Sequence, residues 1–283
     1  MGLTKIQWSD FTQNFWIGCS RVKKERMCSF CYAEKFSERW NFAKWGEEGN
    51  RHKTSESNWK KPYAWNRKAI KEGVRYKVFC SSLSDIFDDH KSIPQEWRDN
   101  LFKTIRETQN LDWLLLTKRP ENYTKFLPAD WIEGYRNVWM GVSIGDKRGR
   151  DARMDHFLNT PAYVRFISGE PLLERFELPD YGITQFICGG ESGPISKIGE
   201  LDLNVVRYMI DQAKEKGIKV FFKQTGSILS KKLKLKDGHG GDFDEYPPAL
   251  DWLKIREVPD PHPSFQLFPP NPEDINEDLK LEL

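Results

Sequence analysis

The sequence lacks several features that mark well-known classes of protein. It contains no apolar run of the roughly 20 residues that a transmembrane helix needs. Its N-terminus does not show the basic and then apolar pattern of a signal peptide. No Gly-x-Gly-x-x-Gly motif follows an early predicted strand, so the usual Rossmann fingerprint is absent. We therefore expect a cytoplasmic protein with no part in the membrane.

Cysteine is scarce, and the net charge is small. The 283 residues include five cysteines, three of which lie within residues 19–31, and the formal net charge is +2. An odd, clustered set of cysteines is typical of intracellular thiols or metal ligands rather than of disulfides. The small charge gives no general signal for a polyanionic partner. A lone catalytic nucleophile with suitably spaced His and Asp residues is not recognisable either.

The clustered cysteines, Cys19, Cys28 and Cys31, have the spacing Cys-x8-Cys-x2-Cys. A basic segment at residues 21–26 separates the first two, and nearby positive charge lowers thiol pKa values and helps to gather thiolates. The last two cysteines are close enough in sequence for both sulfurs to reach one ion or cluster. Three cysteines can hold a 4Fe-4S cluster that keeps one iron open for a ligand.

Two other interpretations of these cysteines stay open. A structural zinc ion usually has four protein ligands, so a zinc site would need a fourth ligand, for which His52 or Cys188 is a candidate. Alternatively, the three cysteines bind no metal and are ordinary core residues. Cys80 and Cys188 lie within apolar segments, where a cysteine is most simply a small core residue.

Short apolar segments alternate with helical segments from residue 76 onward. Such alternation indicates βαβ units and a parallel sheet that is covered on both faces. Together with a strand that precedes the first clustered cysteine, the expected strands are 14–18, 77–82, 111–118, 137–143, 163–170, 185–193 and 219–226. Six to seven parallel strands in units of this size predict an α/β fold, a complete or partial (β/α) TIM-like barrel. A flavodoxin-like open sheet is the alternative.

The chain is predicted to form one barrel domain over residues 1–256, with an N-terminal cysteine-motif loop and an insertion of basic and aromatic helices at about residues 33–75. Residues 257–283 contain six prolines and seven acidic residues, and we predict an extended or disordered C-terminal tail. The loop within residues 227–256 could bring His239 or Asp242 to a site, although a solvated loop is the simpler interpretation.

Residues 39–75 contain ten Lys or Arg residues and four Asp or Glu residues. Rings alternate with cations around Trp59 and Trp65, a pattern that suits stacking on bases and pairing with phosphates. This region therefore predicts a nucleic acid or nucleotide partner. The alternative is an amphipathic helix from Pro62 whose tryptophans pack on the core.

Functional side chains of a (β/α) barrel lie at the carboxyl ends of its strands. The predicted strands end in hydroxyl, carboxylate and ammonium groups, and the candidate cofactor-binding residues among them are Ser82, Lys118, Ser143, Glu170 and Glu191. Glu191 belongs to a Gly-Gly-Glu-Ser-Gly motif, in which bare N–H groups can approach an anion. A tight turn with a surface Glu is the alternative for this motif. No catalytic residue is identified.

Several motifs together resemble an uncharacterised, phage-associated three-cysteine-motif family over most of residues 4–260. They include Trp-Ser-Asp at 8–10, Cys-Tyr-Ala-Glu at 31–34, Leu-Thr-Lys-Arg-Pro at 116–120, Ser-Gly-Glu-Pro-Leu at 168–172 and Phe-Lys-Gln at 222–224. The resemblance implies a family but no activity.

At a greater distance, the layout is similar to the radical S-adenosylmethionine superfamily, whose last cysteine pair is Cys-x-aromatic-Cys, as at residues 28–31. This resemblance implies that Cys19, Cys28 and Cys31 bind a 4Fe-4S cluster and that the open iron binds S-adenosylmethionine, with Ser143 near its ribose. It also implies an external electron donor and a 5′-deoxyadenosyl radical, used here to modify or repair nucleic acid or a nucleotide. The sequence departs from that superfamily in its first spacing, Cys-x8-Cys in place of Cys-x3-Cys, and in lacking Gly-Gly-Glu after the second strand.

Two further functions remain as alternatives. One is a zinc-binding, nucleic-acid-binding or non-redox phage-related protein in which the three cysteines form a structural metal site. The other is an interaction module that docks a partner through its basic region and its acidic tail.

Overall fold

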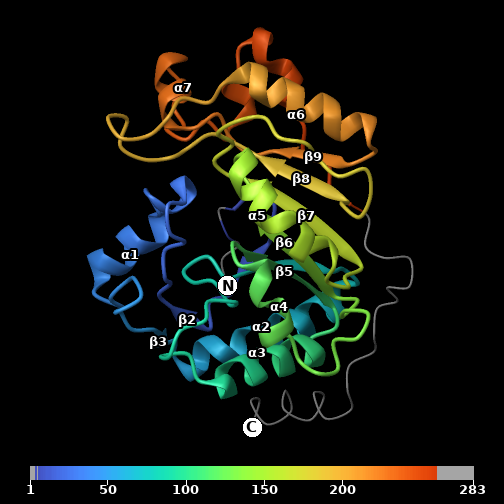
Figure 1. The fold of residues 1–283 in the computed structure, drawn as a ribbon. Helices are drawn as coiled ribbons and strands as arrows, with labels where there is room; N and C mark the ends of the chain where they lie inside the picture. Colours follow the sequence, from blue (N-terminus) through green and yellow to red (C-terminus); the bar gives the residue numbers. More distant parts are fainter. Residues whose placement is uncertain (1–3, 5, 260–283) are drawn as a thin grey trace.

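A computed structural model describes residues 4 and 6–259 of the chain. Its centre is a sheet of seven parallel strands in the order β1-β4-β5-β6-β7-β8-β9, which is also their order along the chain. The strands are Phe11–Thr12 (β1), Tyr76–Cys80 (β4), Leu111–Thr117 (β5), Val138–Ser143 (β6), Val164–Gly169 (β7), Gln185–Cys188 (β8) and Lys219–Phe222 (β9). The sheet curls into an α/β half-barrel (Figure 1).

The sheet is open in the part of the chain that the structure describes, because β1 and β9 are its two edges and do not pair with each other. A closed TIM barrel is therefore not observed, and the α/β half-barrel is the fold. The flavodoxin-like alternative is wrong, because that fold interleaves its strands whereas these strands are neighbours in chain order.

The predicted strand at residues 14–18, directly before Cys19, is not part of the large sheet. The edge strand of the large sheet is β1, whereas Trp16–Ile17 (β2) pairs antiparallel with His52–Lys53 (β3) in a separate small sheet. Between the two strands, the side chain of Asn14 accepts a hydrogen bond from the Leu83 backbone N–H at 2.7 Å and also contacts Ser82. These side-chain contacts replace ladder pairing and turn the chain away from the sheet.

Seven helices accompany the strands in the described residues. They are Tyr32–Trp40 (α1), Glu56–Glu72 (α2), Gln95–Glu107 (α3), Tyr123–Phe126 (α4), Lys147–Leu158 (α5), Leu203–Glu215 (α6) and Ser227–Lys232 (α7). Their ends follow local rules: Ser55 caps α2 by accepting from the Asn58 N–H, and Gly73 ends that helix in the left-handed conformation. Helix α6 has Lys216 as its C-cap and is followed by Gly217 in the left-handed conformation, with φ of 68°.

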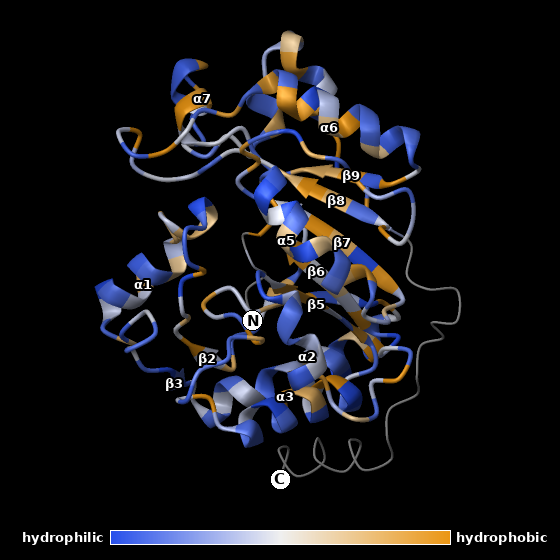
Figure 2. Cartoon of the chain, in the orientation of Figure 1, coloured by the Kyte–Doolittle hydropathy of each residue, from blue (hydrophilic) through white to orange (hydrophobic). Residues whose placement is uncertain are grey.

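The two faces of the sheet bury different sets of side chains. Alternate strand residues pack against the helices on one face, as Trp113 and Met140 do. The residues between them point to the concave face, where Phe79, Leu114, Trp139, Phe166 and Phe221 form a second cluster. In Figure 2, strands β7 and β8 are largely orange, whereas helix α1 is largely blue or pale. Side chains thus fill the half-barrel interior, and a site can form only at one end of it.

The basic segment around α2 packs as an amphipathic helix. Trp59 and Trp65 are 8% and 5% exposed, and their rings contact Phe15 and Phe11, respectively. These two rings are therefore not available to stack on bases, and the core-packing alternative is confirmed for them. The lysines of the same helix, such as Lys60 and Lys61, are exposed.

The C-terminal part of the described chain packs beside β9. Backbone N–H groups of Thr225 and Gly226 donate to the carbonyl groups of Gly240 and His239, which holds the loop against the strand end. Residues 260–283 of the predicted tail lie outside the described residues. None of the helices described is long and apolar enough to cross a membrane.

Candidate functional site

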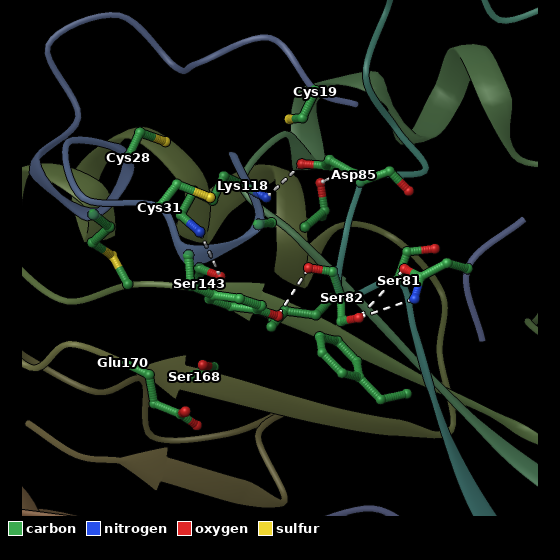
Figure 3. A pocket seen from close by; sticks show the side chains of 18 of the residues that line it. Cys19, Cys28, Cys31, Ser81, Ser82, Asp85, Lys118, Ser143, Ser168 and Glu170 are labelled. Carbon is green, nitrogen blue, oxygen red and sulfur yellow. Dashed lines mark hydrogen bonds between the residues drawn. The ribbon is translucent and has the colours of Figure 1, made fainter. Parts of the chain in front are cut away.

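A cavity of about 520 Å³ opens at the carboxyl ends of the strands (Figure 3). It combines the three clustered cysteines with polar residues from strand ends, which belong to segments far apart in sequence. Of the candidate residues, the cavity is lined by Cys19, Cys28, Cys31, Ser82, Lys118, Ser143 and Glu170. The position of parallel strand ends therefore brings together residues that the sequence separates by about 150 positions.

The three cysteines reach the cavity from three different local structures. Cys19 follows Gly18, which bridges to Ser84; Cys28 ends the turn Arg26–Cys28; and Cys31 is the N-cap of α1. All three are free thiols. In the described part of the chain, no group of three or more His, Cys, Asp or Glu side chains is close enough to hold a metal ion as it stands.

The donor chemistry of the cavity is compatible with a metal centre that is bound through cysteine sulfur. Three soft sulfur donors line it, and two cations, Lys118 and Arg119, lie beside them, which suits an anionic cluster. The zinc alternative needs a fourth ligand. Neither candidate lines the cavity, because Cys188 is fully buried within β8 and His52 is exposed on β3.

The thiol of Cys19 lies over a buried network of charges. Burial raises the pKa of Cys19 to about 12, and the nearby positive charge of Arg119 opposes that rise. The guanidinium of Arg119 lies 3.5 Å from the sulfur and is itself bonded to Asp85 at 3.0 Å. Burial also raises the pKa of Cys28, and the charge of Lys118 opposes it. Burial thus outweighs the positive charge of Arg119 and Lys118 at these two thiols, and both pKa values lie above the ordinary value.

Asp85 joins the ends of two neighbouring strands beneath the cavity. Its carboxylate accepts from the Thr117 hydroxyl at 2.7 Å, from the Lys118 backbone N–H at 3.1 Å and from Arg119. The Lys118 ammonium is left to point toward Ser143, 3.5 Å from its hydroxyl oxygen. Asp85 thus positions Lys118 and Arg119, the two cations that follow β5.

Glu170 lies at the opposite side of the cavity floor. Its carboxylate accepts from the indole N–H of Trp8 at 3.1 Å and forms an ion pair with Lys223. Trp8 and Lys223 both line the cavity, yet neither was among the candidate site residues. These two residues belong to the Trp-Ser-Asp and Phe-Lys-Gln motifs of the sequence. The neighbouring residues in those motifs do not indicate that either side chain meets Glu170.

Glu191 and its glycines do not line the cavity. The carboxylate of Glu191 is buried and accepts from the Gly199 backbone N–H at 3.0 Å, so it holds a neighbouring loop. The backbone N–H of Gly190 donates to the Gln224 carbonyl at 2.9 Å. The glycines therefore allow two backbone segments to approach, and the ligand-binding interpretation of this motif finds no support in the geometry.

Replacing Gly190 by Ala tests that packing role. A Cβ atom there would lie 2.1 Å from the carbonyl oxygen of Thr225, so we expect the free energy of unfolding to fall by about 1–3 kcal/mol. Urea denaturation measures the change. Gly238→Ala is the matched control, because a Cβ at that position would meet nothing within 4 Å. Equal stability of the two variants would contradict the packing role.

Comparison with known proteins adds one match. A family model described as "Protein of unknown function (DUF5131)" covers residues 3–247. No curated protein and no solved structure matches the chain. The family description names neither a phage nor S-adenosylmethionine, so both of those resemblances stay predictions.

Proposed function

We propose that this chain, which belongs to the DUF5131 family of proteins of unknown function, is an iron–sulfur enzyme that binds S-adenosylmethionine. In this proposal Cys19, Cys28 and Cys31 hold a 4Fe-4S cluster. One observation carries it: the three clustered thiols and polar side chains from distant strand ends line a single cavity at the carboxyl edge of an open parallel half-barrel. A purely structural metal site would not need a cavity of this size beside it.

A bound cluster would supply the electron, received from an external donor, that cleaves the sulfonium of S-adenosylmethionine to methionine and a 5′-deoxyadenosyl radical. Two pairs of the chain's own charged residues have tasks around it. Positive charge at Lys118 and Arg119 favours the thiolate form of the cysteine ligands. The Glu170–Lys223 pair presents a carboxylate and an ammonium, which are complementary to the amino and carboxylate groups of an amino acid ligand.

The remaining candidates suit a hydroxyl-rich ligand in a partly dry site. The hydroxyl groups of Ser82 and Ser143 line the cavity and are able to donate or accept. Trp8 and Phe79 form its apolar floor, with ring centroids 4.6 Å apart. Such a floor excludes water from beneath a reactive group, a condition that radical chemistry needs in order to avoid side reactions.

The test is the metal content of protein that is purified and reconstituted without oxygen. We expect about four irons and four sulfides per chain and an absorption band near ~400 nm. Addition of S-adenosylmethionine and a strong reductant should then release 5′-deoxyadenosine. Zinc without sulfide would refute the proposal, and so would an intact cluster that never cleaves S-adenosylmethionine.

A further inference from the structure

Helix α1 has the reverse of the usual amphipathic arrangement. Its buried residues are Ala33, Glu34 and Ser37. The aromatic side chains of Tyr32, Phe36 and Trp40, spaced four residues apart, form a stripe that is 59%, 42% and 60% exposed. A helix on the surface of a globular protein normally buries such rings and exposes its acids.

The polar face of α1 is held by specific contacts. Glu34 accepts from the Nε of Arg21 at 2.9 Å, and the Ser37 hydroxyl bonds to both backbone groups of Ala43. These bonds hold the polar face of the helix against the rest of the molecule without any contribution from Phe36 or Trp40. In Figure 1, α1 lies at the edge of the molecule, away from the seven-stranded sheet.

Exposed aromatic side chains are concentrated at this helix. The described residues include six exposed Phe, Tyr or Trp side chains, and four of them lie within residues 32–42. The fourth, Phe42, contacts Phe36 with ring centroids 6.0 Å apart and extends the aromatic surface toward His52. Single exposed rings are ordinary, whereas a contiguous group marks a surface that binds something.

Cations lie beside the rings. Lys35 and Arg39 are exposed and four residues apart, so they form a second stripe next to the aromatic one. Residues 20–46 contain seven Lys or Arg residues and three Glu residues, and two of those three, Glu25 and Glu34, are already paired with arginines. The surface is therefore both aromatic and positively charged, which favours an anionic ligand with flat rings over an apolar protein partner.

The surface is continuous with the cavity. Tyr32 is the first residue of the aromatic stripe and also lines the cavity, where its hydroxyl donates to the Ser82 carbonyl at 2.8 Å. A second hollow, lined by the basic segment 21–26, shares Cys28 with the cavity. A long ligand bound on α1 would thus be able to extend from the outer surface into the cavity that contains the three cysteines.

We propose that α1 is a docking surface for single-stranded nucleic acid. Bases stack on Tyr32, Phe36 and Trp40, and phosphates lie beside Lys35 and Arg39. Four residues of an α-helix advance by about 6 Å, so successive rings of the stripe are separated by about that distance along the helix. This spacing leaves room for a nucleic acid strand to place successive unpaired bases on successive rings. Delivery of one nucleotide into the cavity as a substrate rests on the proposed function, whereas binding itself does not.

Fluorescence anisotropy of a fluorescein-labelled 12-nucleotide oligodeoxythymidylate, with the full chain, tests this surface. We expect saturable binding that weakens as salt rises, because phosphate contacts release counterions. Trp40→Ala should raise Kd by about tenfold, because loss of the ring removes one stacked base. The double variant with Phe36→Ala and Trp40→Ala loses two stacked bases and should raise Kd by about a hundredfold. Tyr181→Ala is the matched control, a ring that is 76% exposed elsewhere and should not change Kd.

The outcomes separate this inference from the proposed function. Wild-type affinity in the double variant, or no saturable binding by the wild-type chain, overturns the docking surface. So does an oligonucleotide-independent change in sedimentation of the double variant, because the rings would then cover a protein interface. Anisotropy is measured on protein without metal, and iron content is measured without oligonucleotide. Failure of the docking surface and failure of the proposed iron–sulfur function can therefore be told apart.

Discussion

A Cys28→Ser variant is expected to fold and to lose the iron and sulfide that the wild-type chain takes up on reconstitution. Iron should fall from about four atoms per chain to less than about one, because a hydroxyl is a poor replacement for a thiolate ligand of an iron–sulfur cluster. Cys28 is a half-buried residue at the end of a short turn that lines the cavity, so its sulfur is not part of the hydrophobic core. Iron and sulfide analysis with circular dichroism measures both parts of the expectation.

Cys188→Ala is the matched control for this variant. Cys188 is fully buried within β8 and does not line the cavity, so its loss should leave iron content unchanged and cost less than about 1.5 kcal/mol of stability. If the Cys28 variant kept all of its iron, the three-cysteine cluster would be refuted. If the control lost iron while keeping its fold, Cys188 would be a further iron ligand, and a cluster held by three cysteines with one open iron would be contradicted.

An Asp88→Ala variant is expected to lose about 3–5 kcal/mol of unfolding free energy, the usual cost of leaving a buried charge without its partner. The Asp88 carboxylate is 2% exposed and accepts from the fully buried guanidinium of Arg51 at 2.6 Å and 3.0 Å, and from the Ser20 backbone N–H. It also lies 3.6 Å from Arg119, whose guanidinium contacts Cys19. Removing it leaves two arginines without their shared carboxylate directly beneath the first cysteine.

The adjacent residue supplies the control for this effect. Asp89 pairs with Lys125 at the surface, where both side chains are more than half exposed, so Asp89→Ala should cost no more than about 1 kcal/mol. Urea denaturation of the two variants compares a buried ion pair with an exposed one at neighbouring positions. Similar stability losses would contradict the structural role of the Asp88 network.

Local patterns predicted the parts of the fold that depend on neighbours in sequence. The apolar runs at 111–118 and 137–143 became β5 and β6. Strand ends were identified as the source of functional groups, and the cavity contains Ser82, Lys118, Ser143 and Glu170. The error at residues 14–18 arose because side-chain hydrogen bonds of Asn14, made to a distant loop, interrupt an apparently regular strand.

Pairing between distant segments was not visible in the sequence. Trp8 and Lys223 meet Glu170 only because the half-barrel brings β7 and β9 beside the N-terminal segment. The Gly-Gly-Glu motif suggested a ligand, yet Gly190 packs on the backbone of another segment and Glu191 holds a loop. A glycine has the same sequence signature whether a ligand or a backbone approaches it.

The sequence by itself determined the alternation of strands and helices, the parallel sheet that this alternation implies and the cluster of three cysteines, since periodicity and spacing are local properties. The tertiary structure alone decided which faces are buried. Trp59 and Trp65 enter the core while the rings of α1 stay in solvent, although both segments mix aromatic and basic residues in the same way. The difference arises because burial depends on what a distant part of the chain presents: α2 packs beneath Phe15 and Phe11, whereas Arg21 binds α1 through Glu34 and leaves its rings uncovered.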